Sequence, residues 1–137
     1  MSEIVIGYDG SDCAQVALDK AVELAGELGD RVVIVFGYGA PGAVGGEMQS
    51  HADAIRERAE AVTGEAVKKV DAAGVKNDVE LVEEHPFEAL INVAADRKAR
   101  MIVVGSHGES PLKGAVLGST AHKLVQLSET PVLVVRA

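Results

Sequence analysis

Four residues near the end of this 137-residue chain have types and a spacing that could bind a phosphate. Gly105, Gly108, Gly118 and Ser119 form the pattern G-x2-G-x9-G-S, which starts after the apolar run 101–104 and ends where a helical pattern begins. A loop that leaves a strand on glycines and enters a helix offers free backbone N–H groups at the positive end of a helix dipole. In a chain with 15 glycines the spacing could arise by chance, but its strand–loop–helix context favours a phosphate site.

A second glycine pattern follows an earlier strand and indicates a loop instead. Gly37, Gly39 and Gly42 spell G-x-G-x-x-G, the dinucleotide-binding pattern. In that motif the third glycine packs a helix that is already under way, whereas here Ala-Val-Gly-Gly follows Gly42. The motif also belongs after the first strand of such a unit, not the second. We therefore interpret residues 37–46 as a mobile lid or loop. The P-loop pattern G-x4-G-K-[ST] is absent.

The elements that would hold these residues alternate strictly between strands and helices. Apolar runs predict five strands, at 3–8, 31–36, 79–82, 101–104 and 131–136. Helical periodicity predicts four helices, which begin after the N-cap Ser11, near Met48, at Pro86 and at Ser119. Such alternation implies parallel strands joined by right-handed crossovers. The predicted fold is a doubly wound, five-stranded α/β sheet in a single domain, 1–137.

The apolar residues of the first three helices recur at intervals of three or four, so each helix has one predicted buried face. These faces are Ala14, Ala17, Leu18, Ala21, Ala25 and Leu28; then Met48, Ala52, Ile55, Ala59, Val62, Ala66 and Val70; then Phe87, Leu90, Ile91, Ala94 and Ala95. Gly29 and Gly74 are expected to end the first two helices. The strand at 79–82 is short and polar, which predicts an edge strand.

Composition and charge exclude several classes of protein. Hydrophobic residues make up 47% of the chain but aromatic residues only 3%, so the core must be aliphatic, as in buried parallel strands under alanine-rich helices. The net charge of −8 argues against nucleic acid or an anionic membrane as a partner. No apolar run approaches the roughly 18 residues that span a membrane, and the first residues show no signal peptide. The single cysteine, Cys13, fits a reducing cytoplasm and is expected to be an ordinary helix residue, not a nucleophile.

The topology predicts where a ligand would bind. In an open α/β sheet, ligands lie beyond the carboxyl ends of the strands, where the winding reverses. If the first and fourth strands flank that reversal, the loops 8–11 and 105–108 meet there. Asp9 could then accept hydrogen bonds from ribose hydroxyls or hold a water on a metal. The alternative is that Asp9, next to Gly10, only favours a turn, but its place at the reversal favours a functional role.

At this point the chain resembles the universal stress protein family over essentially its whole length. The resemblance is carried by the segments 4–11 (IVIGYDGS), 102–106 (IVVGS) and 131–136 (PVLVVR), by the alanines of the first helix, and by Pro86 with Ile91 and Ala94. The spacing G-x2-G-x9-G-[ST] is the ATP-binding signature of that family and is complete here. The resemblance implies a flavodoxin-like sheet, similar to that of adenine nucleotide alpha hydrolases, in the order 3-2-1-4-5, and a protein that usually dimerises.

The resemblance also implies which residues of this chain would surround ATP. Gly7, Tyr8 and Asp9 would border adenine and ribose, and Gly37 would offer its backbone to adenine. Val104 and Gly105, with Ser106 after them, would lie near the ribose and α-phosphate, and Gly108, Gly118, Ser119 and Thr120 would surround the β- and γ-phosphates. Mg²⁺ would be bound mainly by phosphate oxygens and water. No catalytic residue and no protein ligand to a metal is assigned.

Between Gly108 and Gly118 the chain departs from the glycine-rich, basic pattern that is frequent in the family. Glu109 would place a negative charge beside a triphosphate, and Pro111 has no N–H to donate. The nearby cationic candidates are Lys113 and His107, and His107 is mostly neutral at pH 7. These departures put tight ATP affinity in question.

The leading hypothesis is a cytoplasmic, nucleotide-binding stress protein that switches conformation or partners with ATP and Mg²⁺. Fast turnover is not expected because Ser106 and His107 are sequence neighbours and not a triad built by the fold, although slow hydrolysis stays open. The alternative is a non-enzymatic, dimeric interaction module whose site is vestigial or binds another small anion. A flavin electron carrier rests on fold analogy alone.

The last expectation concerns assembly. In the order 3-2-1-4-5, the apolar strand 131–136 is an edge whose backbone N–H and C=O groups lack partners. Pairing with the same strand of a second copy would satisfy these groups in a two-fold contact. The sequence therefore predicts a homodimer through strand 131–136.

Overall fold

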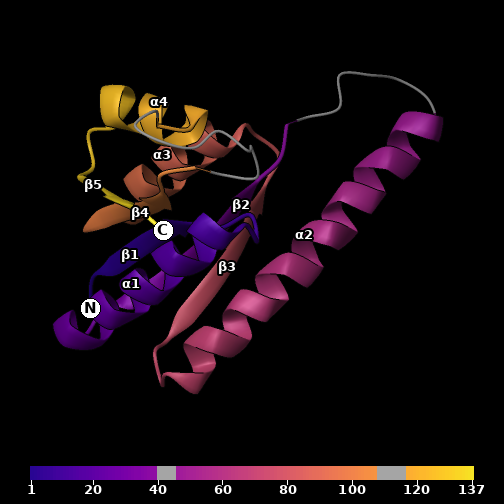
Figure 1. Cartoon of the computed structure of the whole chain (residues 1–137). Helices are drawn as coiled ribbons and strands as arrows, with labels where there is room; N and C mark the ends of the chain where they lie inside the picture. The colour runs from indigo at the N-terminus through magenta and orange to yellow at the C-terminus, as the bar shows by residue number, and fades with distance from the viewer. Residues whose placement is uncertain (40–45, 108–116) are drawn as a thin grey trace.

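The computed structural model describes residues 1–39, 46–107 and 117–137, and its helices and strands alternate along the chain as the sequence predicts (Figure 1). The elements are β1 (Glu3–Gly7), α1 (Asp12–Leu28), β2 (Arg31–Gly37), α2 (Gly46–Ala72), β3 (Asn77–Val82), α3 (Pro86–Arg97), β4 (Met101–Gly105), α4 (Ser119–Leu127) and β5 (Val132–Val135). The strands form one parallel sheet in the order β3-β2-β1-β4-β5. The predicted fold class and strand order are confirmed.

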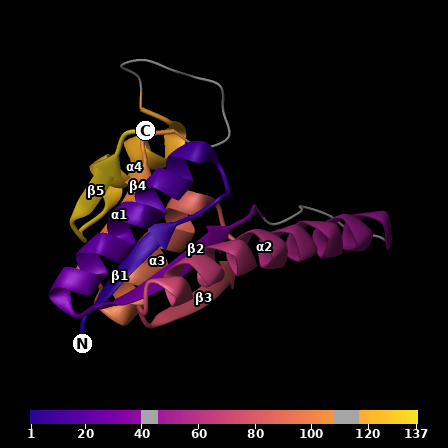
Figure 2. The ribbon, with the colours of Figure 1, turned by 60° about the horizontal axis from the view of Figure 1, so that its bottom comes forward.

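The sheet is covered by helices on both faces, with α1 and α2 on one side and α3 and α4 on the other (Figures 1 and 2). Because side chains alternate along a strand, each central strand contributes to two cores. In β1, Ile4 and Ile6 pack in the core under α1 and α2, whereas Val5 packs in the core under α3. All three are completely buried, which explains why these strands read as continuous apolar runs.

Local signals set the ends of the helices where the sequence predicts them. The Ser11 side chain caps α1 by accepting a hydrogen bond from the Ala14 N–H. Gly29 ends α1 at φ 71°, a left-handed angle that glycine adopts without steric cost, and its N–H donates to the Ala25 carbonyl. Pro86 begins α3, where no intrahelical donor is required. These three expectations are confirmed.

Several details of the predicted elements are wrong at their edges. Leu28, the last residue of α1, is 44% exposed, because the helix has run past the sheet by then. Ala95 of α3 is also exposed, and Val93 is buried in its place. The predicted loop 37–46 is shorter, since Gly37 belongs to β2 and Gly46 begins α2. Residues 40–45, which the lid interpretation concerned, lie outside the described residues.

Helix α2 is the longest element, and its first half projects beyond the sheet (Figures 1 and 2). Among its described side chains, the first buried one is Ala59, followed by Thr63, Ala66 and Val70 on the same stripe. The predicted Val62 is partly buried and packs against the core, and Thr63 beside it is also buried, with its hydroxyl donating to the Ala59 carbonyl at 2.8 Å. Only the second half of α2 therefore packs against the sheet.

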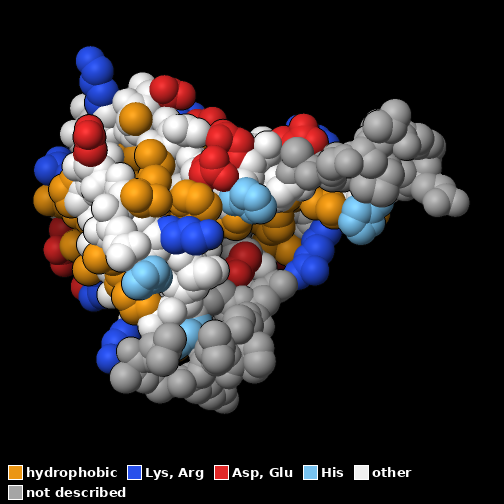
Figure 3. All heavy atoms as spheres, turned by 90° about the horizontal axis from the view of Figure 1, so that it is seen from above, with side chains coloured by type: hydrophobic (Ala, Val, Ile, Leu, Met, Phe, Trp, Pro, Cys, Tyr) orange, Lys and Arg blue, Asp and Glu red, His pale blue; other side chains and the backbone are white. Residues whose placement is uncertain are grey.

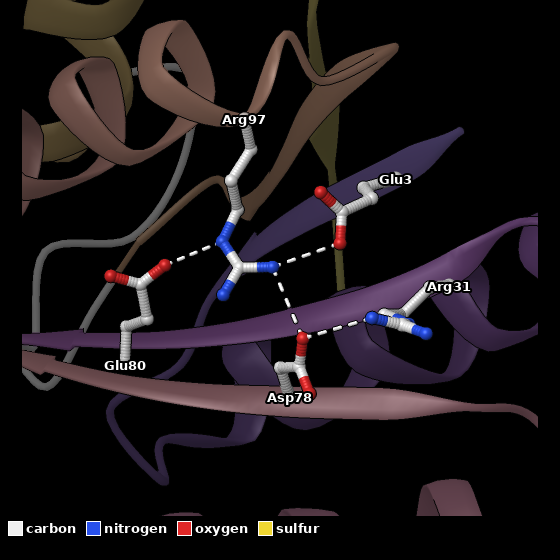
Figure 4. Close-up of polar contacts among 5 residues, drawn as sticks. All are labelled: Glu3, Arg31, Asp78, Glu80 and Arg97. Carbon is white, nitrogen blue, oxygen red and sulfur yellow. Dashed lines mark hydrogen bonds and ion pairs between the residues drawn. The ribbon is translucent and has the colours of Figure 1, made fainter. Parts of the chain in front are cut away.

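Charged side chains gather at the amino edge of the sheet, where the strands begin (Figure 4). Arg97 of α3 donates to Glu80 of β3 at 2.5 Å, to Glu3 of β1 at 2.8 Å and to Asp78 of β3 at 3.2 Å. Arg31 of β2 also lies 3.2 Å from Asp78. One guanidinium thus connects the end of α3 to two strands that are not neighbours.

A second ion pair lies at the same edge. Arg100 donates to both carboxylate oxygens of Asp30, at 2.6 and 3.2 Å. The Asp30 side chain is only 1% exposed, so it depends on Arg100 for compensation of its charge. This pair ties the residue before β4 to the residue before β2.

None of the described helices is long and apolar enough to cross a membrane.

Candidate functional site

A cavity of about 310 Å³ lies at the carboxyl edge of the sheet, on the opposite end from the ion pairs. It is formed by the ends of β1, β2 and β4 and by the starts of α1, α3 and α4. Its lining residues are Gly7, Tyr8, Asp9, Ala14, Val35, Gly37, Pro86, Leu90, Val104, Gly105, Ser106, His107, Gly118, Ser119, Thr120 and Ala121. The cavity therefore lies between β1 and β4, where the order of the strands reverses.

The residues that the sequence predicted for a ligand site come together in this cavity. Those of the described part of the chain all line it: Gly7, Tyr8, Asp9, Gly37, Val104, Gly105, Ser106, Gly118, Ser119 and Thr120. Gly108, the remaining member of the predicted set, lies outside the described residues, as do Glu109, Pro111 and Lys113. Sequence reasoning and geometry thus point to one place on the molecule.

The start of α4 leaves its first-turn N–H groups without a capping side chain. Its N-cap is Gly118, which has no side-chain acceptor, and its first turn contains no acidic residue. The Gly118 N–H itself donates to the Ser106 carbonyl at 2.7 Å, so it is not free for a ligand. The groups of the first turn that remain are the N–H groups of Ser119, Thr120 and Ala121. They combine with the positive end of the helix dipole to favour an anion.

The start of α1 borders the same cavity but is capped by its own residues. Ser11 caps the helix, and Asp12 adds a carboxylate to its first turn. Asp9 Oδ1 accepts a hydrogen bond from the Ser11 N–H at 2.9 Å. The turn-forming role of Asp9 is therefore correct, and the same carboxylate also lines the cavity. The start of α3 has no side-chain cap either, but its first turn contains Pro86, which has no N–H, and the acidic Glu88. Of the three helix starts at the cavity, that of α4 therefore suits an anion best.

Three glycines of the cavity also have a packing role that the sequence did not indicate. A Cβ atom at Gly105 would lie 2.8 Å from the backbone of Cys13 in α1. A Cβ at Gly37 would lie 2.8 Å from Pro86 Cα, and one at Gly7 would lie 2.8 Å from a methyl of Leu90. At Gly105 and Gly37 the contact is with backbone that cannot move locally, so these two positions require glycine, whereas at Gly7 the Leu90 methyl would have to shift. The glycines allow α1 and α3 to approach the strand ends closely and so shape the walls of the cavity.

The wall near α3 is apolar and was not predicted as part of the site. Pro86, Leu90 and Val35 line it, and Leu90 and Val35 are almost fully buried. The sequence identified Pro86 and Leu90 as a helix start and a helix face. Their place next to β2 follows from the packing of α3 across the sheet, for which no local pattern exists.

The ionisable side chains of the cavity are few. Among the described lining residues, Asp9 is the one carboxylate, and Lys and Arg are absent. Tyr8 is 6% exposed, and burial raises the pKa of its phenol, with nearby Asp9 adding to the effect. No group of three His, Cys, Asp or Glu residues within the described ranges is arranged to hold a metal ion.

Ser106 and His107 form the remaining polar pair of the cavity. The Ser106 Oγ lies 3.2 Å from His107 Nδ1. Ser106 is 5% exposed, and His107 Nε2 is buried without a hydrogen-bond partner in the part of the chain that the structure describes. The sequence considered His107 as a cationic candidate but did not include it in the site.

Comparisons with known proteins agree with the fold and with the early resemblance. The family model described as "Universal stress protein family" matches residues 1–136. Universal stress protein MJ0531 of Methanocaldococcus jannaschii is 32% identical to this chain over 98% of the chain and 81% of that protein. The solved structure of hypothetical protein MJ0577, a structural-genomics test case, has a TM-score of 0.90 at 25% identity and covers 99% of this chain and 96% of its own. A universal stress protein solved in complex with cAMP has a TM-score of 0.77 at 28% identity, with 98% and 96% covered.

Proposed function

Because the chain belongs to the universal stress protein family, we propose that it binds an adenine nucleotide in the cavity at the carboxyl edge. ATP with Mg²⁺ is the first candidate, and the protein acts as a nucleotide-dependent regulator of a stress response, not as a fast enzyme. The observation that carries the proposal is the uncapped start of α4 next to an apolar wall in one cavity. Such a pairing of apolar surface with few polar groups is typical of small-molecule sites.

Each part of the cavity suits one part of the nucleotide. Adenine lies between the strand ends and α3, against Val35, Pro86 and Leu90, with the Gly37 backbone at its edge. The ribose hydroxyls donate to the Asp9 carboxylate, and Gly7 and Tyr8 adjoin them. Val104 and Gly105 follow along the ribose and α-phosphate. The phosphates meet the N–H groups and hydroxyls of Ser119 and Thr120.

Two further observations support an adenine nucleotide. The relative solved in complex with cAMP shares the fold over nearly its whole length. The family signature G-x2-G-x9-G-S is complete in this chain. ATP is preferred over a monophosphate in this proposal because the signature is that of the ATP-binding members.

Magnesium fits the site only as a companion of the phosphates. Asp9 is the one carboxylate among the described lining residues, and Mg²⁺ requires about six oxygen ligands in an octahedron. The phosphate oxygens and water would therefore supply most of the ligands. Bound Mg²⁺ would neutralise part of the phosphate charge, which matters in a chain with a net charge of −8.

The regulatory role rests on the lack of an evident catalytic arrangement among the described residues. The Ser106 hydroxyl and the His107 ring are hydrogen-bonded sequence neighbours, and no third described group orients the ring as in a triad. Slow hydrolysis of ATP remains compatible with the proposal. We place the protein in the cytoplasm as part of it, because its single cysteine, Cys13, is a free thiol.

Isothermal titration with ATP and Mg²⁺ tests the proposal. The wild type is expected to bind ATP, and Gly118→Val is expected to lose binding because a branched side chain would occupy the start of α4. Gly26→Ala is the control, because Gly26 lies in α1 with open space around it. A folded wild-type protein that fails to bind at millimolar ATP would remove the proposal. Material released on denaturation gives an independent check, since bound adenine would absorb at 260 nm in a protein without Trp.

A dimeric interaction module is the second candidate, and exposed apolar residues near β5 favour it. Leu133 of β5 is 36% exposed, and Val125 and Leu127 of α4 are 57% and 58% exposed. Figure 3 shows orange hydrophobic side chains on the face seen from above, the side of the molecule on which α4 lies in Figure 1. β5 is an edge strand, so it can pair with the same strand of a second copy. Both candidates share this homodimer, and only the second dispenses with the nucleotide.

Sedimentation equilibrium tests the dimer. The wild type is expected to have twice the 14.2 kDa mass of the chain. Leu133→Lys is expected to shift it toward the monomer, whereas Val16→Lys on α1, which replaces a similarly exposed residue, is not. A wild type that stays monomeric at tens of micromolar would contradict the pairing of β5.

A further inference from the structure

His107 presents a polar atom that the rest of the described protein leaves without a partner. Its Nδ1 lies 3.2 Å from the Ser106 hydroxyl, and its Nε2 is buried and makes no hydrogen bond to any described residue. Native structures rarely leave a buried polar atom in this state. Because His107 lines the cavity, a ligand in the cavity is the obvious candidate for the missing partner.

The hydrogen bond to Ser106 decides which of the two ring nitrogens of His107 carries the hydrogen atom. If the Ser106 hydroxyl donates to Nδ1, the ring is protonated at Nε2, and the Nε2–H is the one donor of the pair without an acceptor. If Nδ1–H donates to the hydroxyl instead, the buried Ser106 hydroxyl hydrogen and the Nε2 lone pair both lack partners among the described residues. The first arrangement leaves fewer groups unsatisfied, so it is the more stable one. Ser106 therefore holds His107 as an Nε2–H donor.

This donor lies at the end of the cavity that favours an anion. The Ser106 carbonyl accepts a hydrogen bond from the Gly118 N–H at 2.7 Å, which fixes the segment 106–107 to the start of α4. The uncapped N–H groups of α4 begin one residue later, at Ser119. The apolar wall of Pro86 and Leu90 is contributed by α3. The acceptor that suits the His107 donor is therefore an oxygen of the phosphate and not a group of the base.

We infer that His107, oriented by Ser106, donates a hydrogen bond from Nε2 to a phosphate oxygen and so makes the site select nucleotides over nucleosides. This inference rests on the proposed nucleotide site. Binding of a nucleoside would leave the Nε2–H unpaired, whereas a phosphate satisfies it with a charged acceptor. Ser106 acts as the positioning residue, and His107 is the residue that touches the ligand.

Titrations with adenosine, AMP and ATP with Mg²⁺ test the selectivity. His107→Leu is expected to weaken AMP and ATP binding roughly tenfold or more, the loss that follows from removing one hydrogen bond to a charged group. Its affinity for adenosine is expected to stay within about twofold, since by this inference the nucleoside makes no bond to Nε2. His107→Gln, which places an amide donor near the position of Nε2, is expected to recover much of the AMP affinity. His122→Gln is the control, because His122 is exposed on α4.

The outcomes separate this inference from the proposed function. A wild type that binds none of these ligands contradicts both. A wild type that binds AMP while His107→Leu binds it equally well overturns the inference and leaves the proposed function standing. Equal losses for AMP and adenosine in His107→Leu indicate a purely structural role and also overturn it.

A spectroscopic measurement tests the same inference without depending on ligand binding by any variant. Long-range ¹H–¹⁵N spectra at pH 8 are expected to show one histidine ring in the Nε2–H form, assigned to His107 by its absence in His107→Gln. Ser106→Ala is expected to release the ring into a mixture of both forms. Addition of AMP to the wild type is expected to shift the Nε2–H signal. A ring protonated at Nδ1, or a signal that AMP does not move, would contradict the inference.

Discussion

The two edges of the sheet use their polar groups in opposite ways. At the amino edge, Arg97 pairs with three carboxylates and Arg100 pairs with the buried Asp30 (Figure 4). At the carboxyl edge, the described cavity residues include no Lys or Arg, no side chain caps the start of α4, and the Nε2 of His107 has no partner among the described residues. Charge is compensated within the protein at the amino edge, whereas the polar groups at the carboxyl edge lack such compensation, as the proposed nucleotide site requires.

The difference follows from the direction of a parallel sheet. All strands start at one edge and end at the other, so all helices begin at the carboxyl edge and present their positive ends there. At the amino edge the helices end, and side chains such as Arg97, in the last turn of α3, both suit the helix dipole and reach the strands. Stability is therefore expected to depend on side-chain pairs at the amino edge and on close backbone packing at the carboxyl edge.

The largest expected effect is at the carboxyl edge, from Gly105→Ala. The added Cβ would lie 2.8 Å from the Cys13 backbone, which cannot move without shifting α1. We expect the free energy of unfolding to fall by about 3 kcal/mol, at the upper end of the usual cost of overpacking. Urea denaturation measures it. Gly26→Ala, with open space around it in α1, is expected to raise stability by about 0.5–1 kcal/mol, and equal effects of the two changes would contradict the packing role.

Arg97→Met tests the amino edge. It leaves Glu3, Asp78 and Glu80 without this guanidinium in a cluster that is only 18–41% exposed. We expect a loss of about 2 kcal/mol, between the values for buried and for surface ion pairs. Lys20→Met, which breaks an exposed pair with Glu23, is expected to change stability by less than about 0.5 kcal/mol. ATP affinity of the folded Arg97→Met protein should match the wild type, and a clear loss of affinity would show that the two edges are not independent.

Ser11→Ala sharpens the contrast between the capped start of α1 and the uncapped start of α4. Ser11 accepts the Ala14 N–H, so its removal is expected to cost about 1 kcal/mol, a typical value for an N-cap. Ser2→Ala, at an exposed position before β1, is the control and should be near neutral. Thermal unfolding of the two variants measures the difference, and equal midpoints would mean that the cap does not stabilise α1.

The smallest expected effect concerns Tyr8 at alkaline pH. Burial raises the pKa of the Tyr8 phenol, so the folded state holds this proton more tightly than the unfolded state. The corresponding stability is fully present below the unfolded pKa, near 10.0, and is lost as pH rises through the folded value. The difference in free energy of unfolding between the wild type and Tyr8→Phe should be constant between pH 7 and 9. Above pH 10 the wild type should lose stability relative to the variant. A constant difference up to pH 11 would contradict the burial of the phenol.

The sequence predicts the structure correctly where a pattern of neighbouring residues is itself the cause of the local structure. Continuous apolar runs identified the buried strands, and Ser11, Gly29 and Pro86 identified helix ends, because caps and turns depend on neighbouring residues only. It was less accurate where an element runs past the core. Leu28 continues the apolar stripe of α1 but is exposed, since periodicity does not tell where the sheet ends.

The sequence by itself determined the order of elements, the family and the set of glycines and hydroxyl residues that meet at the cavity. These features can be derived from the sequence because they depend on the order and spacing of residues along the chain. Only the tertiary structure decided which residues that are distant in the sequence contact one another. Arg100 binds Asp30, which lies 70 residues earlier, and Gly105 packs on Cys13. It also decided that Gly118 donates its own N–H to the Ser106 carbonyl and that the Nε2 of His107 has no partner among the described residues. Pairings over such distances depend on how helices cross the sheet, and no local pattern of residues specifies that crossing.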